Sequence, residues 1–169
     1  ALRMSSSAVT SLQEARTASA RPRGGRIVAI ASGKGGVGKT WLAITLSHAL
    51  ARAGQRVLLF DGDLGLANVY IQLGLTPSAD LSAVLAGRRA LQDAVTPHAG
   101  GFDILAGHSG SGALASVAPA ALESVLAALR GAAGRYHTVV LDLGAGLDRP
   151  VRRMAVFADL LLVVATEEP

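Results

Sequence analysis

The sequence predicts an α/β fold, with three layers in which helices flank both faces of a mostly parallel β-sheet, and three observations support it. Short apolar runs alternate with segments of helical periodicity along the 169 residues. Hydrophobic residues make up 50% of the chain and charged residues only 17%, so the strands can be buried on both faces. A glycine-rich loop joins the first apolar run to the first helical segment. A chain of this length fits one core of ordinary size.

The expected elements follow in order from these patterns. Apolar runs predict buried strands at residues 26–31, 57–60, 102–106, 136–141 and 159–166. Helices are expected from near Lys39 to Gly54 and at residues 77–87, 119–133 and 151–158. Glycines end the first two of these helices, and Ser78 or Asp80 is the N-cap candidate of the second.

The loop at residues 32–40, S-G-K-G-G-V-G-K-T, has the residues that a phosphate-binding loop requires. From Gly33 to Thr40 it fits the pattern G-x-x-x-x-G-K-S/T. Glycine adopts φ angles that a Cβ forbids, so successive N–H groups can point at phosphate oxygens; these glycines are Gly33, Gly35, Gly36 and Gly38. A helix N-terminus and Lys39 add positive charge near the β- and γ-phosphates, and the Thr40 hydroxyl is placed to bind Mg²⁺. The sequence therefore predicts a nucleotide site.

Three aspartates follow apolar runs that are predicted to be strands. Asp61 and Asp63 come at the end of the second run, where ligands bind in open α/β sheets, and extended chain would turn both carboxylates to one side. Together they could address Mg²⁺ or its waters; the alternative is a pair of helix caps. Asp142 follows the run 136–141, as an aspartate that holds the Mg²⁺ water shell does in proteins with this loop.

Composition excludes several classes of function. The chain has no cysteine, which excludes iron–sulfur clusters and thiolate metal sites, so no metal cluster is expected. It has no apolar run of about 18 residues and no signal-peptide apolar region, so a cytoplasmic protein is expected. The net charge of +4 would suit nucleic acid or anionic lipid as a partner, or simply a solvated arginine-rich surface. Loop residues His108 and Ser109 are adjacent, which does not suit nucleophilic catalysis.

Three motifs in register resemble the MinD/ParA family of ATPases. Lys34 makes the loop similar to that family's deviant phosphate-binding pattern, K-G-G-x-G-K-S/T. Residues 61–69, D-G-D-L-G-L-A-N-V, resemble the D-x-D-x-G-L-x-N segment of MinD and, more closely, that of the flagellar-number regulators FlhG or FleN. Residues 142–146, D-L-G-A-G, resemble the family's D-x-G-A-G.

The resemblance implies roles for these residues. It implies ATP as ligand, Mg²⁺ as cofactor, and an ATP-dependent homodimer in which Lys34 reaches the partner's phosphates, comparable to an arginine finger. It implies that Asp63 orients the attacking water and that Asp61 belongs to the magnesium shell with Thr40 and Asp142. The remaining nucleotide contacts would come from the loop and the segment after it, through Gly33, Gly35, Gly36, Val37, Gly38, Lys39, Trp41 and Asn68.

The chain also departs from the family pattern. Relatives commonly have aspartate where this chain has Tyr70, at a position linked to partner or dimer contacts. Trp41 replaces a small or polar residue and could crowd the nucleotide or stack on the sheet. Residues 1–25 are expected to be a flexible tail, and residues 26–169 an ATPase domain truncated on its C-terminal side. The missing part carries adenine contacts and a membrane-targeting helix in relatives, so peripheral contact with the inner face of the membrane is expected only of a full-length form.

The implied function is an ATP-driven spatial switch that regulates flagellar number or placement, with flagellar regulatory proteins as partners. Two alternatives remain open. One is a division-site or partition ATPase, which is the same enzyme class in another setting. The other is a scaffold that binds nucleotide without hydrolysing it.

Overall fold

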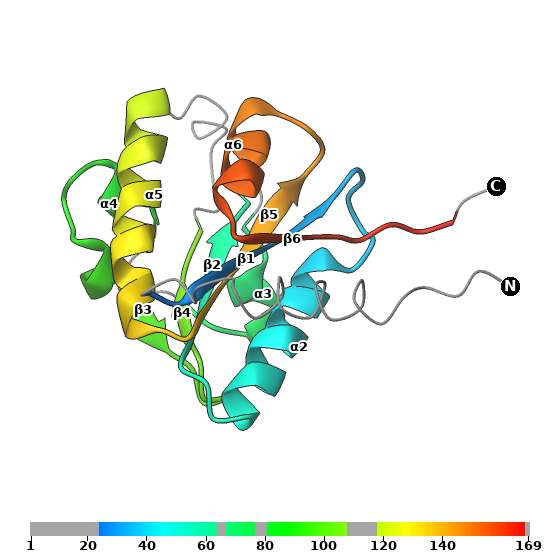
Figure 1. Cartoon of the computed structure of the whole chain (residues 1–169), viewed down its shortest axis with the longest axis horizontal. Coiled ribbons are helices and arrows are strands. Elements are labelled where there is room, and N and C mark those ends of the chain that lie inside the picture. The colour runs from blue at the N-terminus through cyan, green and yellow to red at the C-terminus, as the bar shows by residue number, and fades with distance from the viewer. Residues whose placement is uncertain (1–23, 64–66, 77–80, 108–117, 168–169) are drawn as a thin grey trace, which may run out of the picture.

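The computed structural model describes residues 24–63, 67–76, 81–107 and 118–167. The tail predicted at residues 1–25 lies outside them except for its last two residues, as do the N-cap candidates Ser78 and Asp80 and the pair His108 and Ser109. The described residues form one sheet with helices on both faces (Figure 1).

Six strands form the sheet in the order β3-β4-β2-β5-β1-β6. All neighbouring strands pair in parallel except β3 and β4, which are antiparallel. The strands are β1 Arg26–Ser32, β2 Val57–Gly62, β3 Val95–Pro97, β4 Asp103–Leu105, β5 Thr138–Ala145 and β6 Leu160–Val163. The predicted α/β class with a mostly parallel sheet is confirmed. The short strand β3 was not predicted, because three residues are too few to show a period.

The helices are α2 Lys39–Arg52, α3 Val69–Leu73, α4 Leu81–Leu85, α5 Pro119–Ala132 and α6 Arg149–Phe157, with short 3₁₀ turns at Leu91–Ala94 and Ala133–Arg135. Four of the five agree with a predicted segment, and α3 is additional. Helix α6 begins earlier than predicted because the Asp148 carboxylate accepts a hydrogen bond from the Val151 amide at 2.9 Å and caps its first turn.

Strand residues alternate between two apolar cores, one on each face of the sheet. Ile27 and Leu58 point to the side covered by α4, α5 and α6, whereas Ile30 and Leu59 point to the side covered by α2 and α3. This follows from the period of two in a strand, which sends successive side chains to opposite faces. Figure 1 shows the two helical layers on either side of the strands. The central strands β1, β2 and β5 are buried on both sides, as their apolar sequences predict.

The prediction that the strand within residues 159–166 is buried is wrong, because β6 is partly exposed. It pairs with β1 alone and is the edge of the sheet that the described residues form. Its apolar side chains are therefore partly open to solvent; Val163 is 67% exposed.

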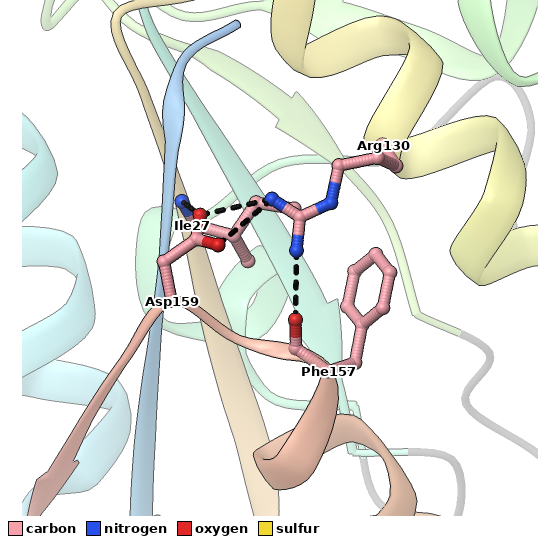
Figure 2. Close-up of polar contacts among 4 residues, drawn as sticks. All are labelled: Ile27, Arg130, Phe157 and Asp159. Atoms are coloured by element: carbon pink, nitrogen blue, oxygen red, sulfur yellow. Dashed lines mark hydrogen bonds and ion pairs between the residues drawn. The ribbon is translucent and has the colours of Figure 1, made fainter. Parts of the chain in front are cut away.

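A polar cluster fixes the connection between α6 and β6 to the rest of the fold (Figure 2). Arg130 on α5 donates to both oxygens of Asp159 at 3.0 and 2.9 Å and to the Phe157 carbonyl at 2.8 Å. Its guanidinium also lies 4.7 Å from the centre of the Phe157 ring. Asp159 in turn accepts a hydrogen bond from the amide of Ile27 in β1 at 2.7 Å. One carboxylate therefore joins β1 and α5 at the start of β6.

No helix in the described part of the chain is both long and apolar enough to cross a bilayer.

Candidate functional site

The site is built where the central parallel strands end. Strands β2 and β5 are neighbours, and Asp61 lies directly opposite Asp142 in their register. Strand β1 lies on the other side of β5, with Ile30 opposite Asp142, and leads into the glycine loop. Because parallel strands bring their carboxyl ends to one edge of the sheet, the loop and the aspartates meet there, as predicted.

The loop conformation is fixed at both ends. The Ser32 hydroxyl donates to the Lys34 carbonyl at 2.6 Å, and the Gly38 carbonyl accepts the first helical hydrogen bond from Leu42 at 2.9 Å. Gly36 and Gly38 have φ angles of 78° and 93°, which residues other than glycine rarely adopt. The expectation that all four loop glycines need such angles is wrong for the remaining two, Gly33 and Gly35, because their φ angles are not in this region.

Lys39 and Thr40, the first two residues of α2, lie against Asp142. Lys39 is only 8% exposed, and its charge acts on the Asp142 carboxyl. The Thr40 hydroxyl is near the same carboxyl and lowers its pKa. Burial raises the pKa of Asp142 to about 6, and the nearby Thr40 hydroxyl and the Lys39 charge limit the rise.

One oxygen of Asp142 has the property expected of a cation ligand. Its Oδ1 atom is buried and has no hydrogen-bond partner among the residues that the structure describes. A buried carboxylate oxygen without a partner is costly, and a bound Mg²⁺ or one of its waters would satisfy it. Among the described residues no three acidic or histidine side chains come together to enclose a metal. This arrangement is consistent with Mg²⁺, which usually takes one or two protein oxygens and completes its shell with phosphates and water. The residues present therefore fit this cation.

Asp61 is fully buried, and both of its oxygens accept backbone hydrogen bonds. The amide of Asp63 donates to Oδ1 at 3.2 Å, and the amide of Val69, the first residue of α3, donates to Oδ2 at 3.0 Å. Burial raises the pKa of Asp61 to about 7, because its amide partners only partly offset desolvation and the nearby charges of Asp142 and Asp63. The capping role that the sequence left open is thus present at Asp61, whose carboxylate binds the first amide of α3 at the end of β2.

Asp63 follows β2 and lies above the end of β5. A Cβ placed on Gly144 would be 3.4 Å from Asp63 Oδ1, so the carboxyl sits over the D-x-G-A-G segment. Its charge contributes to the raised pKa of both Asp61 and Asp142. Asn68 is the N-cap residue of α3, although its side chain makes no capping hydrogen bond. The structure therefore places the three predicted aspartates at the same edge of the sheet, although they do not converge on one metal position.

The two residues that depart from the family pattern lie in different environments. Trp41 is 66% exposed, so the expectation that its ring could stack on the sheet is wrong. Tyr70 is buried and packs in the core between α2, α3 and the sheet. A side chain in that position is not placed for contact with a partner, so Tyr70 is a core residue.

Two structural features of the site were not predicted. The amide of Gly146, at the end of the D-x-G-A-G segment, donates to the Ser32 carbonyl at 3.0 Å and ties that segment to the loop. Gly107 leaves room for Asp61, because a Cβ there would lie 2.8 Å from the Asp61 carbonyl and 3.1 Å from its carboxyl carbon. A glycine directly after the β4 run is the sequence signal that could have indicated this close approach.

A glycine loop of this conformation between β1 and α2, with a buried lysine beside an aspartate of β5, defines the P-loop class of nucleotide-binding proteins. Within that class the chain belongs to the CobQ/CobB/MinD/ParA nucleotide binding domain family, whose model matches residues 28–164. The family resemblance of the three motifs is thereby confirmed.

Known proteins agree with this assignment. The chain is 37% identical over 144 residues to the antiactivator FleN of Pseudomonas aeruginosa, covering 85% of this chain and 51% of that protein. It is 29% identical over 144 residues to the flagellum site-determining protein YlxH of Helicobacter pylori, covering 85% and 49%. The structure of the septum site-determining protein MinD of Pyrococcus horikoshii complexed with Mg-ADP matches with a TM-score of 0.74 and 33% identity, covering 82% and 57%. The chain therefore spans about half the length of the curated relatives it matches.

Proposed function

We propose that this chain binds Mg-ATP at the glycine loop and hydrolyses it as part of a MinD-like switch. The observation that carries the proposal is the buried, unpartnered Oδ1 atom of Asp142 beside Thr40 and Lys39. The oxygens of Thr40 and Asp142 suit the metal of a bound nucleotide, and the Lys39 ammonium and the loop suit its phosphates. The MinD structure complexed with Mg-ADP supports the same ligands.

Each residue of the site has a proposed task. Thr40 and Asp142 hold Mg²⁺, directly or through water, and Lys39 binds the β- and γ-phosphates together with the amides of the loop. Asp63 orients the attacking water, because it lies over the segment that faces the loop. Asp61 belongs to the outer part of the magnesium shell, since its own oxygens already accept amides. Bound Mg²⁺ supplies charge that neutralises the phosphates.

Lys34 is proposed to act across a dimer formed with ATP. It is exposed on the loop, where a second subunit could approach. ATP hydrolysis, measured as phosphate release, should fall sharply in Lys34→Ala, and sedimentation should show dimers with Mg-ATP and monomers with Mg-ADP. An unchanged rate in a protein that stays monomeric would exclude this trans mechanism. Binding of labelled ATP without phosphate release by the unaltered chain would instead favour the non-hydrolysing scaffold.

The proposed cellular task is control of flagellar number or placement. Its support is the identity to FleN and to the flagellum site-determining protein YlxH. The test is expression of the longest form of this protein in a flagellated bacterium that lacks its own number regulator, followed by counting flagella by electron microscopy. A restored number supports the proposal, and Lys39→Ala should fail to restore it.

A division-site function is the second candidate, because the MinD structure is 33% identical to this chain. The two candidates differ in what the same cells show. Minicells or filaments after overexpression, with an unchanged flagellar number, would favour division-site control.

A further inference from the structure

A groove between α5 and α6 lies outside the proposed nucleotide site. It has a volume of about 310 Å³, and its apolar lining comes from Pro119, Leu122, Pro150 and Val156. Leu122 is buried at its floor, whereas Val156 is 80% exposed at its rim. A valine this open to solvent beside a concave apolar surface is typical of a binding site for another polypeptide.

The rim of the groove is strongly basic. Arg149, Arg152 and Arg153 line it, and Glu123 is the only acidic residue among the described residues of its lining. Glu123 is already occupied, because Arg153 donates to its two oxygens at 2.5 and 2.7 Å. Arg149 and Arg152 are exposed and have no ion-pair partner among the described residues. The charges of Arg149 and Arg152 are therefore available to bind an acidic ligand.

We propose that this groove is a docking site for an acidic, amphipathic peptide segment of a partner protein, which places one aliphatic or aromatic side chain on Leu122 and pairs its carboxylates with Arg149 and Arg152. Charge complementarity indicates this ligand, because two unpaired arginines beside a small apolar pocket can bind carboxylates on either side of one apolar side chain. A concave floor favours a protruding side chain over the flat surface of a membrane. Residues 108–117 of this chain, which precede α5, contain no aspartate or glutamate, so they lack the matching charge.

The groove is also close in sequence to the proposed nucleotide site. Arg149 begins α6 three residues after Gly146, whose amide is bonded to the Ser32 carbonyl of the loop. At its other end, α6 is held by the Arg130 contact with the Phe157 carbonyl (Figure 2). A peptide in the groove would thus touch a helix that is tied to the loop at one end and to α5 at the other. Docking itself does not depend on the nucleotide proposal.

The test is selection from a displayed library of random 12-residue peptides on the purified chain, followed by fluorescence anisotropy with the enriched peptides. We expect peptides with two or more acidic residues around one Leu, Ile, Met or Phe. Arg149→Glu with Arg152→Glu should weaken their binding at least about tenfold, because a like charge replaces each attraction. Val156→Asp should do the same. The matched control is Arg52→Glu with Arg56→Glu, which changes the net charge equally at two exposed arginines away from the groove and should leave affinity unchanged.

Circular dichroism must show that each variant is folded, and hydrogen exchange should show protection by peptide confined to α5 and α6. The proposal is overturned if no peptide is enriched, if the enriched peptides lack acidic residues, or if the control weakens binding as much as the groove variant. It is also overturned if phosphatidylglycerol vesicles bind the groove and the peptides do not, since the site would then be a lipid site. Self-association that the groove variant abolishes would assign the groove to a second copy of this chain and would likewise overturn it.

Discussion

Asp61 and Asp142 lie opposite each other on adjacent parallel strands, both buried at the carboxyl end of the sheet. Burial raises the pKa of Asp61 to about 7 and that of Asp142 to about 6, and the charge of Asp142 adds to the effect on Asp61. The two differ in their partners: Asp61 accepts two backbone amides, whereas Asp142 keeps one oxygen without a partner. One carboxylate is therefore suited to hold the chain and the other to hold a ligand.

The first prediction concerns pH. Because both pKa values are raised in the folded chain, the folded state binds more protons than the unfolded state between about pH 4 and pH 7. The free energy of unfolding without nucleotide should therefore fall as pH rises through this window, by roughly 1.4 kcal/mol for each pKa unit. Urea unfolding at pH 5 and pH 8 measures it. Asp61→Asn should flatten the dependence, and a steeper one in that variant would contradict the assignment.

The second prediction concerns magnesium. Asp142→Asn keeps the shape of the side chain but removes the charge, so Mg-ATP affinity should fall about tenfold or more, while affinity for ATP in EDTA should change little. Isothermal titration calorimetry with and without Mg²⁺ measures both. The double variant Asp142→Asn, Thr40→Ala should lose less Mg-ATP binding free energy than the sum of the losses in the two single variants, since the two residues share one cation. Strict additivity would show that they act at separate places.

The sequence identified most of the site because its parts are short and local. The loop is one continuous segment, and the aspartates at 61, 63 and 142 each follow an apolar run, so strand order alone brings them together. The division of roles between Asp61 and Asp142 could not be predicted, because it depends on which amides α3 presents to β2. The exposure of β6 was missed for a similar reason, since a central and an edge strand can have the same apolar run.

The third prediction uses two glycines that differ in the space around them. Gly107→Ala would place a Cβ 2.8 Å from the Asp61 carbonyl and 2.9 Å from the Ala67 Cβ, so it should destabilise the fold by about 1–3 kcal/mol. Gly131→Ala is the control. It lies in α5, where the new Cβ would meet no atom within 4 Å apart from its chain neighbours and the backbone of its own helix, and should stabilise the fold by roughly 0.5–1 kcal/mol through helix propensity. Thermal unfolding distinguishes them, and equal shifts would refute the close approach at Gly107.

The fourth prediction concerns the cluster around Asp159. Asp159→Ala removes the acceptor of the Ile27 amide and of Arg130 together, leaving a strand amide unpaired, so it should cost about 1–3 kcal/mol. Arg130→Ala leaves the Ile27 hydrogen bond in place and should cost less.

An ion pair on the same layer provides the matched control. Arg153 and Glu123 also form a two-oxygen contact, but Glu123 bonds to no strand amide in the described part of the chain, so Glu123→Ala should change stability much less than Asp159→Ala. Chemical denaturation of the three variants gives their order. If Glu123→Ala lowered the free energy of unfolding as much as Asp159→Ala, the hydrogen bond from β1 to Asp159 would contribute no additional stability. A larger loss in Asp159→Ala would instead show that the junction of β1, α5 and β6 is stabilised by the hydrogen bond from the Ile27 amide to the Asp159 carboxylate.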